Sequence, residues 1–189
     1  TLLFNNPSMK IDSTNLGEYV LTSSQVVKNS YNSTTNYLTI NKGLKDSVKE
    51  DHGVITSKGI VGIIDNISSG YARVMSILNT NSQVNAKLKN SDHFGTLSWD
   101  AKSPEVVQLV DIQKQAAVAP GDSIVTSGRS TIFPKGIPIG TVISYKLDET
   151  ENYKTIQVRL FNDMTNIGHV HIIQNTDKEE IQSLEAQDE

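Results

Sequence analysis

Residues 48–64, VKEDHGVITSKGIVGII, and residues 118–142, VAPGDSIVTSGRSTIFPKGIPIGTV, are the two stretches that decide the fold. In both, a polar turn precedes an apolar pair and a Thr-Ser dipeptide, and the second copy begins 70 residues after the first. Aligning Gly62 with Gly140 leaves eight extra residues in the second copy. A repeat of this kind predicts two related small β units rather than one large sheet.

The rest of the chain continues this pattern of short strands. Runs rich in β-branched and aromatic residues alternate with clusters of Asn, Gly, Asp, Ser and Lys, and Val84, Ala86 and Leu88 show the two-residue period of a strand. About a dozen strands at this spacing are typical of all-β barrels or sandwiches. The predicted strands are residues 19–28, 37–41, 53–57, 60–66, 72–78, 83–88, 94–99, 106–111, 123–126, 137–147, 154–160 and 169–174.

We therefore expect an all-β fold of two small barrels with strands exchanged between them. Residues 19–59 together with about 129–175 are assigned to the first barrel, and about 60–128 to the second. Residues 1–18, with neither alternation nor helical period, are expected to be a linker. Residues 176–189 carry six acidic residues against Lys178 alone, which predicts a solvated acidic tail with at most a short helix.

Composition excludes several function classes. The 189 residues carry a formal charge of −4 and contain no cysteine, so no disulfide framework or thiolate metal site is available. No basic run suggests nucleic-acid binding, and no segment approaches the roughly 18 apolar residues of a membrane span. The first residue is Thr1 rather than Met, so we expect a fragment whose membrane anchor, if present, lies upstream.

Two constellations could carry chemistry. Gly121-Asp122-Ser123 matches the start of the nucleophile motif of two-barrel serine proteases, and His52, Asp92 and Ser123 follow that family's order. Ile124, however, stands where the protease motif has glycine, so a turn before a strand is the favoured interpretation. His169 and His171 share one face of a predicted strand, but the sequence ties no third metal ligand to them. We predict no catalysis, no metal and no cofactor.

The second copy of the repeat resembles the MreC family of rod shape-determining proteins. The likeness rests on a GD dipeptide, an apolar pair, TSG and then FPxGIPIG, and it extends from about Ser23 to Ile173. Prolines and glycines at fixed spacing turn a chain sharply, so the role of this stretch is structural. The matching residues are Gly121, Asp122, Thr126, Ser127, Gly128, Phe133, Pro134, Gly136, Pro138 and Gly140.

This resemblance implies a non-catalytic scaffold of the cell-wall elongation machinery, made of two small barrels that follow a membrane helix and a coiled coil. Its location would be the bacterial periplasm or the outer face of the cytoplasmic membrane. The implied partners are an elongation penicillin-binding transpeptidase, MreD, the MreB-linked cytoskeletal complex and a second copy of the chain. The membrane helix and the coiled coil are not in this sequence, which leaves its own dimerisation open.

The partner-facing residues predicted from the sequence lie mainly in the insertion, residues 128–135. Arg129, Phe133, Pro134 and Lys135 are chosen because the insertion is the main difference between the two repeats. A purely structural hinge would explain the insertion as well. Trp99 is added because Trp99 and Phe94 fall on opposite faces of one strand, so that one of them can be exposed to anchor a partner. The remaining alternative is a peptidoglycan-binding module that uses Trp99.

Overall fold

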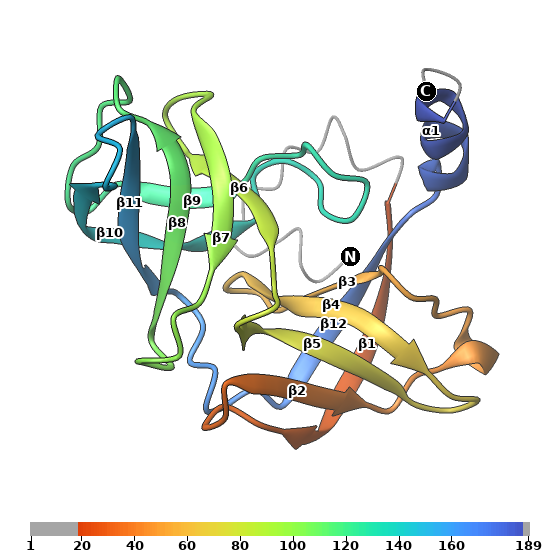
Figure 1. The fold of residues 1–189 in the computed structure, drawn as a ribbon. Helices are drawn as coiled ribbons and strands as arrows, with labels where there is room; N and C mark the ends of the chain where they lie inside the picture. Colours follow the sequence, from red (N-terminus) through yellow and green to blue (C-terminus); the bar gives the residue numbers. More distant parts are fainter. Residues whose placement is uncertain (1–18, 187–189) are drawn as a thin grey trace.

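The computed structural model describes residues 19–186, which form twelve strands and one α-helix (Figure 1). The predicted linker, residues 1–18, lies outside the described residues. A single turn of 3₁₀ helix, Leu44–Asp46, follows the second strand. The elements are β1 (Tyr19–Asn29), β2 (Thr35–Ile40), β3 (Gly53–Ile55), β4 (Ile60–Ile67), β5 (Ala72–Asn79), β6 (Val84–Leu88), β7 (Phe94–Ser98), β8 (Val106–Gln113), β9 (Ser123–Thr126), β10 (Pro138–Leu147), β11 (Tyr153–Leu160), β12 (His169–Asn175) and α1 (Lys178–Glu185).

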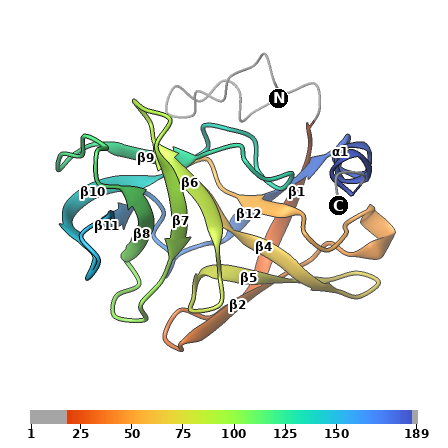
Figure 2. The ribbon, with the colours of Figure 1, turned by 45° about the horizontal axis from the view of Figure 1, so that its top comes forward.

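The strands close into two barrels, as the sequence predicted. The first has the order β1-β12-β3-β4-β5-β2 and the second the order β10-β11-β8-β7-β6-β9. The pairings within both are antiparallel, so alternate side chains point into each barrel and fill it. Closure leaves neither sheet with an open edge. Figures 1 and 2 show the barrels side by side, with the segment between β9 and β10 projecting from the second barrel toward the first.

The predicted division of the chain between the barrels differs from the observed one. Residues 60–79, assigned to the second barrel, form β4 and β5 of the first. Residues 138–160, assigned to the first barrel, form β10 and β11 of the second. The first barrel is nevertheless discontinuous, because β12 returns to pair between β1 and β3. Strand partners are long-range choices, and alternation along a strand does not encode them.

The internal repeat is confirmed by the backbone hydrogen bonds. In both copies, the turn before the short strand exchanges two bonds with the strand that follows it. These bonds are Asp51 N to Ile64 O (2.8 Å) and Ile64 N to His52 O (2.9 Å) in the first copy, and Gly121 N to Val142 O (2.8 Å) and Val142 N to Asp122 O (2.8 Å) in the second.

The two aligned glycines also have equivalent surroundings. A Cβ at Gly62 would lie 2.1 Å from the carbonyl oxygen of Met75, and one at Gly140 would lie 2.0 Å from that of Arg159. Each glycine therefore permits a close approach of the neighbouring strand at the same point of its barrel. The eight extra residues are a true insertion into an otherwise matched framework.

In the C-terminal segment, Lys178–Glu185 form α1, beside the first barrel (Figure 1). Lys178 Nζ lies 3.4 Å from the Asp51 carboxylate, and Lys49 Nζ lies 3.3 Å from that of Glu179. These are exposed ion pairs, and such pairs contribute little free energy individually. The predicted acidic tail, residues 176–189, thus contains a short helix whose described contacts are electrostatic. No helix of residues 19–186 has the length and apolar character to cross a membrane.

Candidate partner-binding surface

Hydrogen bonds of Thr126 hold together the two ends of the insertion, residues 128–135. The Thr126 hydroxyl donates to the carbonyl of Pro134 (2.6 Å) and accepts from the amide of Ile137 (2.9 Å), while the Gly136 amide donates to the carbonyl of Thr126 (3.0 Å). Gly128 and Gly136 adopt φ angles of 73° and 95°, which residues with a side chain rarely adopt. The TSG and FPKG portions of the sequence therefore build a closed loop.

The inner side of the insertion packs against the first barrel. Phe133 is 2% exposed, and its ring occupies the space over Gly53 of β3, where a Cβ would come within 2.4 Å of the ring. A Cβ at Gly53 would also lie 2.9 Å from Ile173 of β12, so the ring, Gly53 and Ile173 meet at one point. Pro134 is also buried. The prediction that Phe133 and Pro134 face a partner directly is therefore wrong, since both side chains are inside the chain's own core.

A second junction between the barrels is polar. Asn162, which follows β11, donates to the carbonyls of Gly59 (3.1 Å) and Ile60 (2.9 Å) in the first barrel. Its side-chain oxygen accepts from the hydroxyl of Thr56 at 2.6 Å. This buried amide, at the end of the second barrel's β11, thus bonds three groups of the first barrel between Thr56 and Ile60, so its own polar atoms are satisfied across the junction. Together with Phe133 it fixes one barrel against the other.

The outer side of the insertion carries its two exposed cations. The Arg129 guanidinium lies 3.7 Å from the ring centroid of Phe94, a cation–π contact. The Lys135 ammonium lies 3.6 Å from the carboxylate of Asp92, and Lys87 lies 3.1 Å from the same carboxylate. We call these five residues the outer patch. It joins the insertion to the hairpin between β6 and β7.

The outer patch holds three cations, Lys87, Arg129 and Lys135, against the single carboxylate of Asp92. The hydrogen bond and charge of Lys87, followed by the charge of Lys135, lower the pKa of Asp92 below its usual range. Lys87 is buried under the hairpin and also donates to the carbonyl of Ser91 (2.9 Å). The patch therefore presents an aromatic ring in contact with Arg129 and a net positive charge, a combination suited to protein contact because aromatic residues and arginine are enriched at interfaces.

Trp99 does not take part in this surface. It is 6% exposed, and its indole nitrogen donates to the carbonyl of Ser103 at 2.8 Å. The other member of the pair, Phe94, is 43% exposed. The sequence correctly placed them on opposite faces of β7 and its extension, but the expectation that Trp99 contacts a partner or the wall is wrong because its ring belongs to the core.

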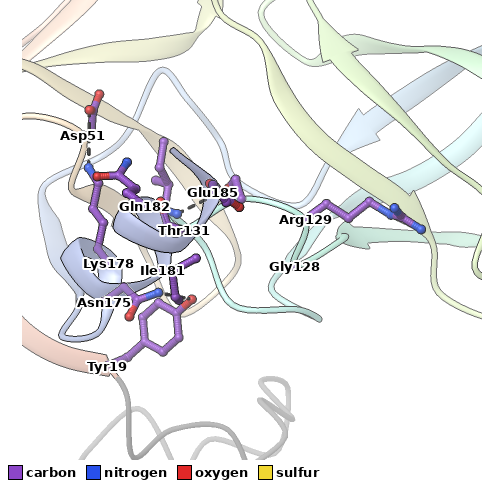
Figure 3. Close-up of a pocket in the computed structure, with 12 residues that line it drawn as sticks. Tyr19, Asp51, Gly128, Arg129, Thr131, Asn175, Lys178, Ile181, Gln182 and Glu185 are labelled. Atoms are coloured by element: carbon purple, nitrogen blue, oxygen red, sulfur yellow. Dashed lines mark hydrogen bonds and ion pairs between the residues drawn. The ribbon is translucent and has the colours of Figure 1, made fainter. Parts of the chain in front are cut away.

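A pocket of about 680 Å³ separates the insertion from α1 (Figure 3). Gly128 to Ile132 form one wall, and Lys178, Ile181, Gln182 and Glu185 of α1 line the other. Figure 3 shows Lys178 directed toward Asp51, while Arg129 points away from the pocket toward the second barrel. The outer patch and this pocket are thus two separate surfaces of one insertion.

The serine-protease constellation is not assembled. His52 belongs to the first barrel, where its Nδ1 accepts from the backbone amide of Lys49 at 3.3 Å. Asp92 and Ser123 belong to the second, and the Asp92 carboxylate is engaged by Lys87 and Lys135. Ser123 pairs through its backbone with Thr141 on β10. None of the contacts described above brings two of the three side chains together.

The histidine pair is placed as predicted on one face of β12. The two rings meet edge to face with centroids 5.1 Å apart, and Ser23 lies 3.3 Å from Nδ1 of His171. Burial, and next the charge of His169, lower the pKa of His171. Within residues 19–186, no group of three or more His, Asp or Glu side chains is arranged to hold a metal ion.

The roles of several residues in these sites were not predicted from the sequence. Lys87 and Asn162 belong to no motif, while Gly53 lies within the repeat but was not predicted to make room for Phe133. A usable clue was available only for Gly53, since glycine within a strand often indicates close approach of another group.

The fold defines the class: a double β-barrel protein whose insertion packs against the first barrel and carries an exposed aromatic and cationic patch on its other side. Residues 26–174 match the family model of the rod shape-determining protein MreC, barrel core, and the chain belongs to that family. The cell shape-determining protein MreC of Listeria monocytogenes is 26% identical over 140 residues, covering 72% of this chain and 48% of the relative. The chain spans about half the length of the curated relatives it matches.

Solved structures agree with this assignment. MreC of Listeria monocytogenes superposes with a TM-score of 0.77 at 25% identity, covering 85% of this chain and 78% of the other. MreC in a complex with the penicillin-binding protein PBP2 from Helicobacter pylori has a TM-score of 0.66 at 16% identity, covering 83% of this chain and 98% of that one. At 16% identity the second likeness shows a shared fold.

Proposed function

We propose that this chain is the double-barrel part of a scaffold that maintains cell shape by holding cell-wall elongation enzymes through protein contacts. The observation that carries the proposal is membership of the MreC family across residues 26–174. The relatives are cell shape-determining proteins, and one member of the fold was solved bound to a penicillin-binding protein. The outer patch is the surface of this chain best suited to such a contact.

The proposed partner is the elongation penicillin-binding transpeptidase of the same organism, outside the cytoplasmic membrane. Arg129 and Lys135 supply charge, while Phe94 supplies an exposed ring held in place by Arg129. A ring fixed before binding loses little conformational freedom in the complex, which favours affinity. MreD, the MreB-linked cytoskeletal complex and a second copy of the chain are further proposed partners, for which the described surfaces provide no separate site.

The proposed role requires no turnover. His52 and Asp92 have other partners, as described above, and no base among residues 19–186 is hydrogen-bonded to the Ser123 hydroxyl. A fluorophosphonate probe should leave the folded chain unlabelled. Labelling that disappears in Ser123→Ala would instead establish a reactive serine and overturn the scaffold proposal in its non-catalytic form.

The scaffold proposal is tested by calorimetry with the periplasmic domain of the cognate elongation transpeptidase. Saturable 1:1 binding is expected, and Arg129→Ser should weaken it about tenfold or more, the loss typical of an energetically important interface arginine. Lys146→Ser is the matched control, since it removes the same charge from an exposed residue of β10 outside the patch. No binding, or equal weakening by both variants, contradicts the placement of the interface.

A further inference from the structure

A second exposed feature adjoins the outer patch, shares Asp92 and Phe94 with it, and goes beyond the proposed scaffold function. A groove of about 420 Å³ runs across the outer face of the second barrel, over β7, β8 and the start of β11. Figure 1 shows these three strands side by side, with β8 in the middle. Phe94 lines one wall and Tyr153 the other, and each side chain is 43% exposed.

The two aromatic residues belong to strands separated by one intervening strand. Gln113 of β8 pairs directly with Tyr153, while Thr96 of β7 pairs with Val110. Neighbouring strands lie about 4.8 Å apart, so the aromatic walls stand on the order of 10 Å from each other. Outward-facing polar side chains fill the interval between them.

Three of these polar side chains are available to a ligand. Thr96, Asp111 and Gln113 line the groove, and their side chains make no hydrogen bond or ion pair with residues 19–186. Together they offer a hydroxyl, a carboxylate and an amide, which include both donors and acceptors. Such a mixture suits a ligand with many hydroxyl and amide groups.

A bulge in β8 shapes the groove floor. The pairing between β8 and β11 shifts opposite residues 110–111, and Asp111 has a φ of 63°. Bulges redirect side chains, and here the bulge turns the carboxylate of Asp111 outward. Gly95 lies beneath, where a Cβ would come within 2.1 Å of the carbonyl oxygen of Val110. The absence of a side chain at Gly95 thus lets β7 approach β8 closely beside the bulge.

We propose that this groove binds a glycan strand, with the aromatic rings stacking on the apolar faces of successive sugar rings. Aromatic side chains provide large apolar faces with little entropy to lose, and the Arg129 contact already holds Phe94 in position. Hydroxyl and acetamido groups of an amino-sugar polymer match the donors and acceptors of Thr96, Asp111 and Gln113. A disaccharide unit can span the interval between the two walls.

Charge favours an uncharged ligand over a cationic peptide. Of the two carboxylates that line the groove, Asp92 is held by Lys87 and Lys135, which leaves Asp111 alone to attract a cation. Arg129 stands over Phe94 at the groove's edge and repels a second cation. No lysine or arginine of residues 19–186 lines the groove, so a polyanion would meet no permanent counter-charge inside it. A neutral polyol fits these conditions.

The test is a titration of the ¹⁵N-labelled chain with chitotetraose, followed by amide chemical shifts. Saturable shifts are expected at β7, β8 and the start of β11. Tyr153→Ala should weaken binding about two- to tenfold, the factor of one aromatic contact, while Tyr145→Ala, a half-exposed tyrosine of the same barrel outside the groove, should leave it unchanged. Shifts elsewhere, no saturation, or equal loss in both variants overturns the proposal.

Two further experiments distinguish a glycan from a cationic peptide, and the groove from the transpeptidase interface. Asp111→Asn should retain most glycan binding, since an amide still bonds to hydroxyl groups. The same variant would abolish binding of a lysine-rich peptide, which needs the negative charge. Salt-sensitive binding of that peptide without binding of chitotetraose overturns the glycan assignment. Tyr153→Ala should leave transpeptidase binding intact, because Tyr153 is not in the outer patch. Loss of the scaffold interaction and loss of the glycan interaction are therefore measured independently.

Discussion

Replacing Phe133 by alanine should destabilise the chain more than any exposed substitution in the insertion. The ring is 2% exposed and fills the space over Gly53 at the junction of the barrels. Removing a buried phenylalanine ring typically costs about 3–5 kcal/mol, through lost burial and the cavity left behind. Gly53→Ala should also destabilise the chain, because its new Cβ would come within 2.4 Å of the Phe133 ring. Overpacking of this kind costs about 1–3 kcal/mol.

The two substitutions should not be additive. Without the ring, the alanine at position 53 gains space, so the double variant Phe133→Ala/Gly53→Ala should be more stable than the sum predicts, by about 0.5–3 kcal/mol. Urea denaturation followed by fluorescence of the single tryptophan, Trp99, measures all three variants. An additive double variant, or a Phe133→Ala cost under about 1 kcal/mol, would refute the argument that this ring locks the barrels together.

Three further outcomes follow from the same structure. Thr126→Val should cost about 2 kcal/mol or more in urea denaturation, because it leaves buried partners at the base of the insertion unpaired, whereas Thr126→Ser should cost less. Asn162→Ala should cost about 1–3 kcal/mol for the same reason and should increase amide hydrogen exchange at Ile60, which becomes accessible as the junction loosens. Burial, then the charges of Lys178 and Lys49, lower the pKa of His52, so that as the pH falls this histidine is protonated at a higher pH in the unfolded chain than in the native one. The free energy of unfolding should therefore decrease as the pH drops below about 6.5. His52→Gln should reduce this dependence of the unfolding free energy on pH.

The strand positions and the repeat were predictable from sequence because both depend on local pattern. Turn residues and two-residue alternation marked the limits of most strands, and the Gly62–Gly140 alignment anticipated two glycines with equivalent surroundings. Assignment of strands to barrels was not predictable, since it depends on pairings such as β12 with β1 across the whole chain. The prediction that Phe94 and Trp99 lie on opposite faces of the β7 region is confirmed. Alternation alone, however, does not say which of the two faces meets the core.

The insertion illustrates why a segment that differs between repeats need not serve contact alone. The first copy turns from β3 into β4 without the eight extra residues and still closes its barrel, so closure does not require them. What the second copy gains is Phe133, placed against the first barrel, and Arg129 and Lys135, placed on the outer face. The hinge and contact hypotheses are therefore not mutually exclusive, because one side of the loop packs against the first barrel while the other exposes Arg129 and Lys135.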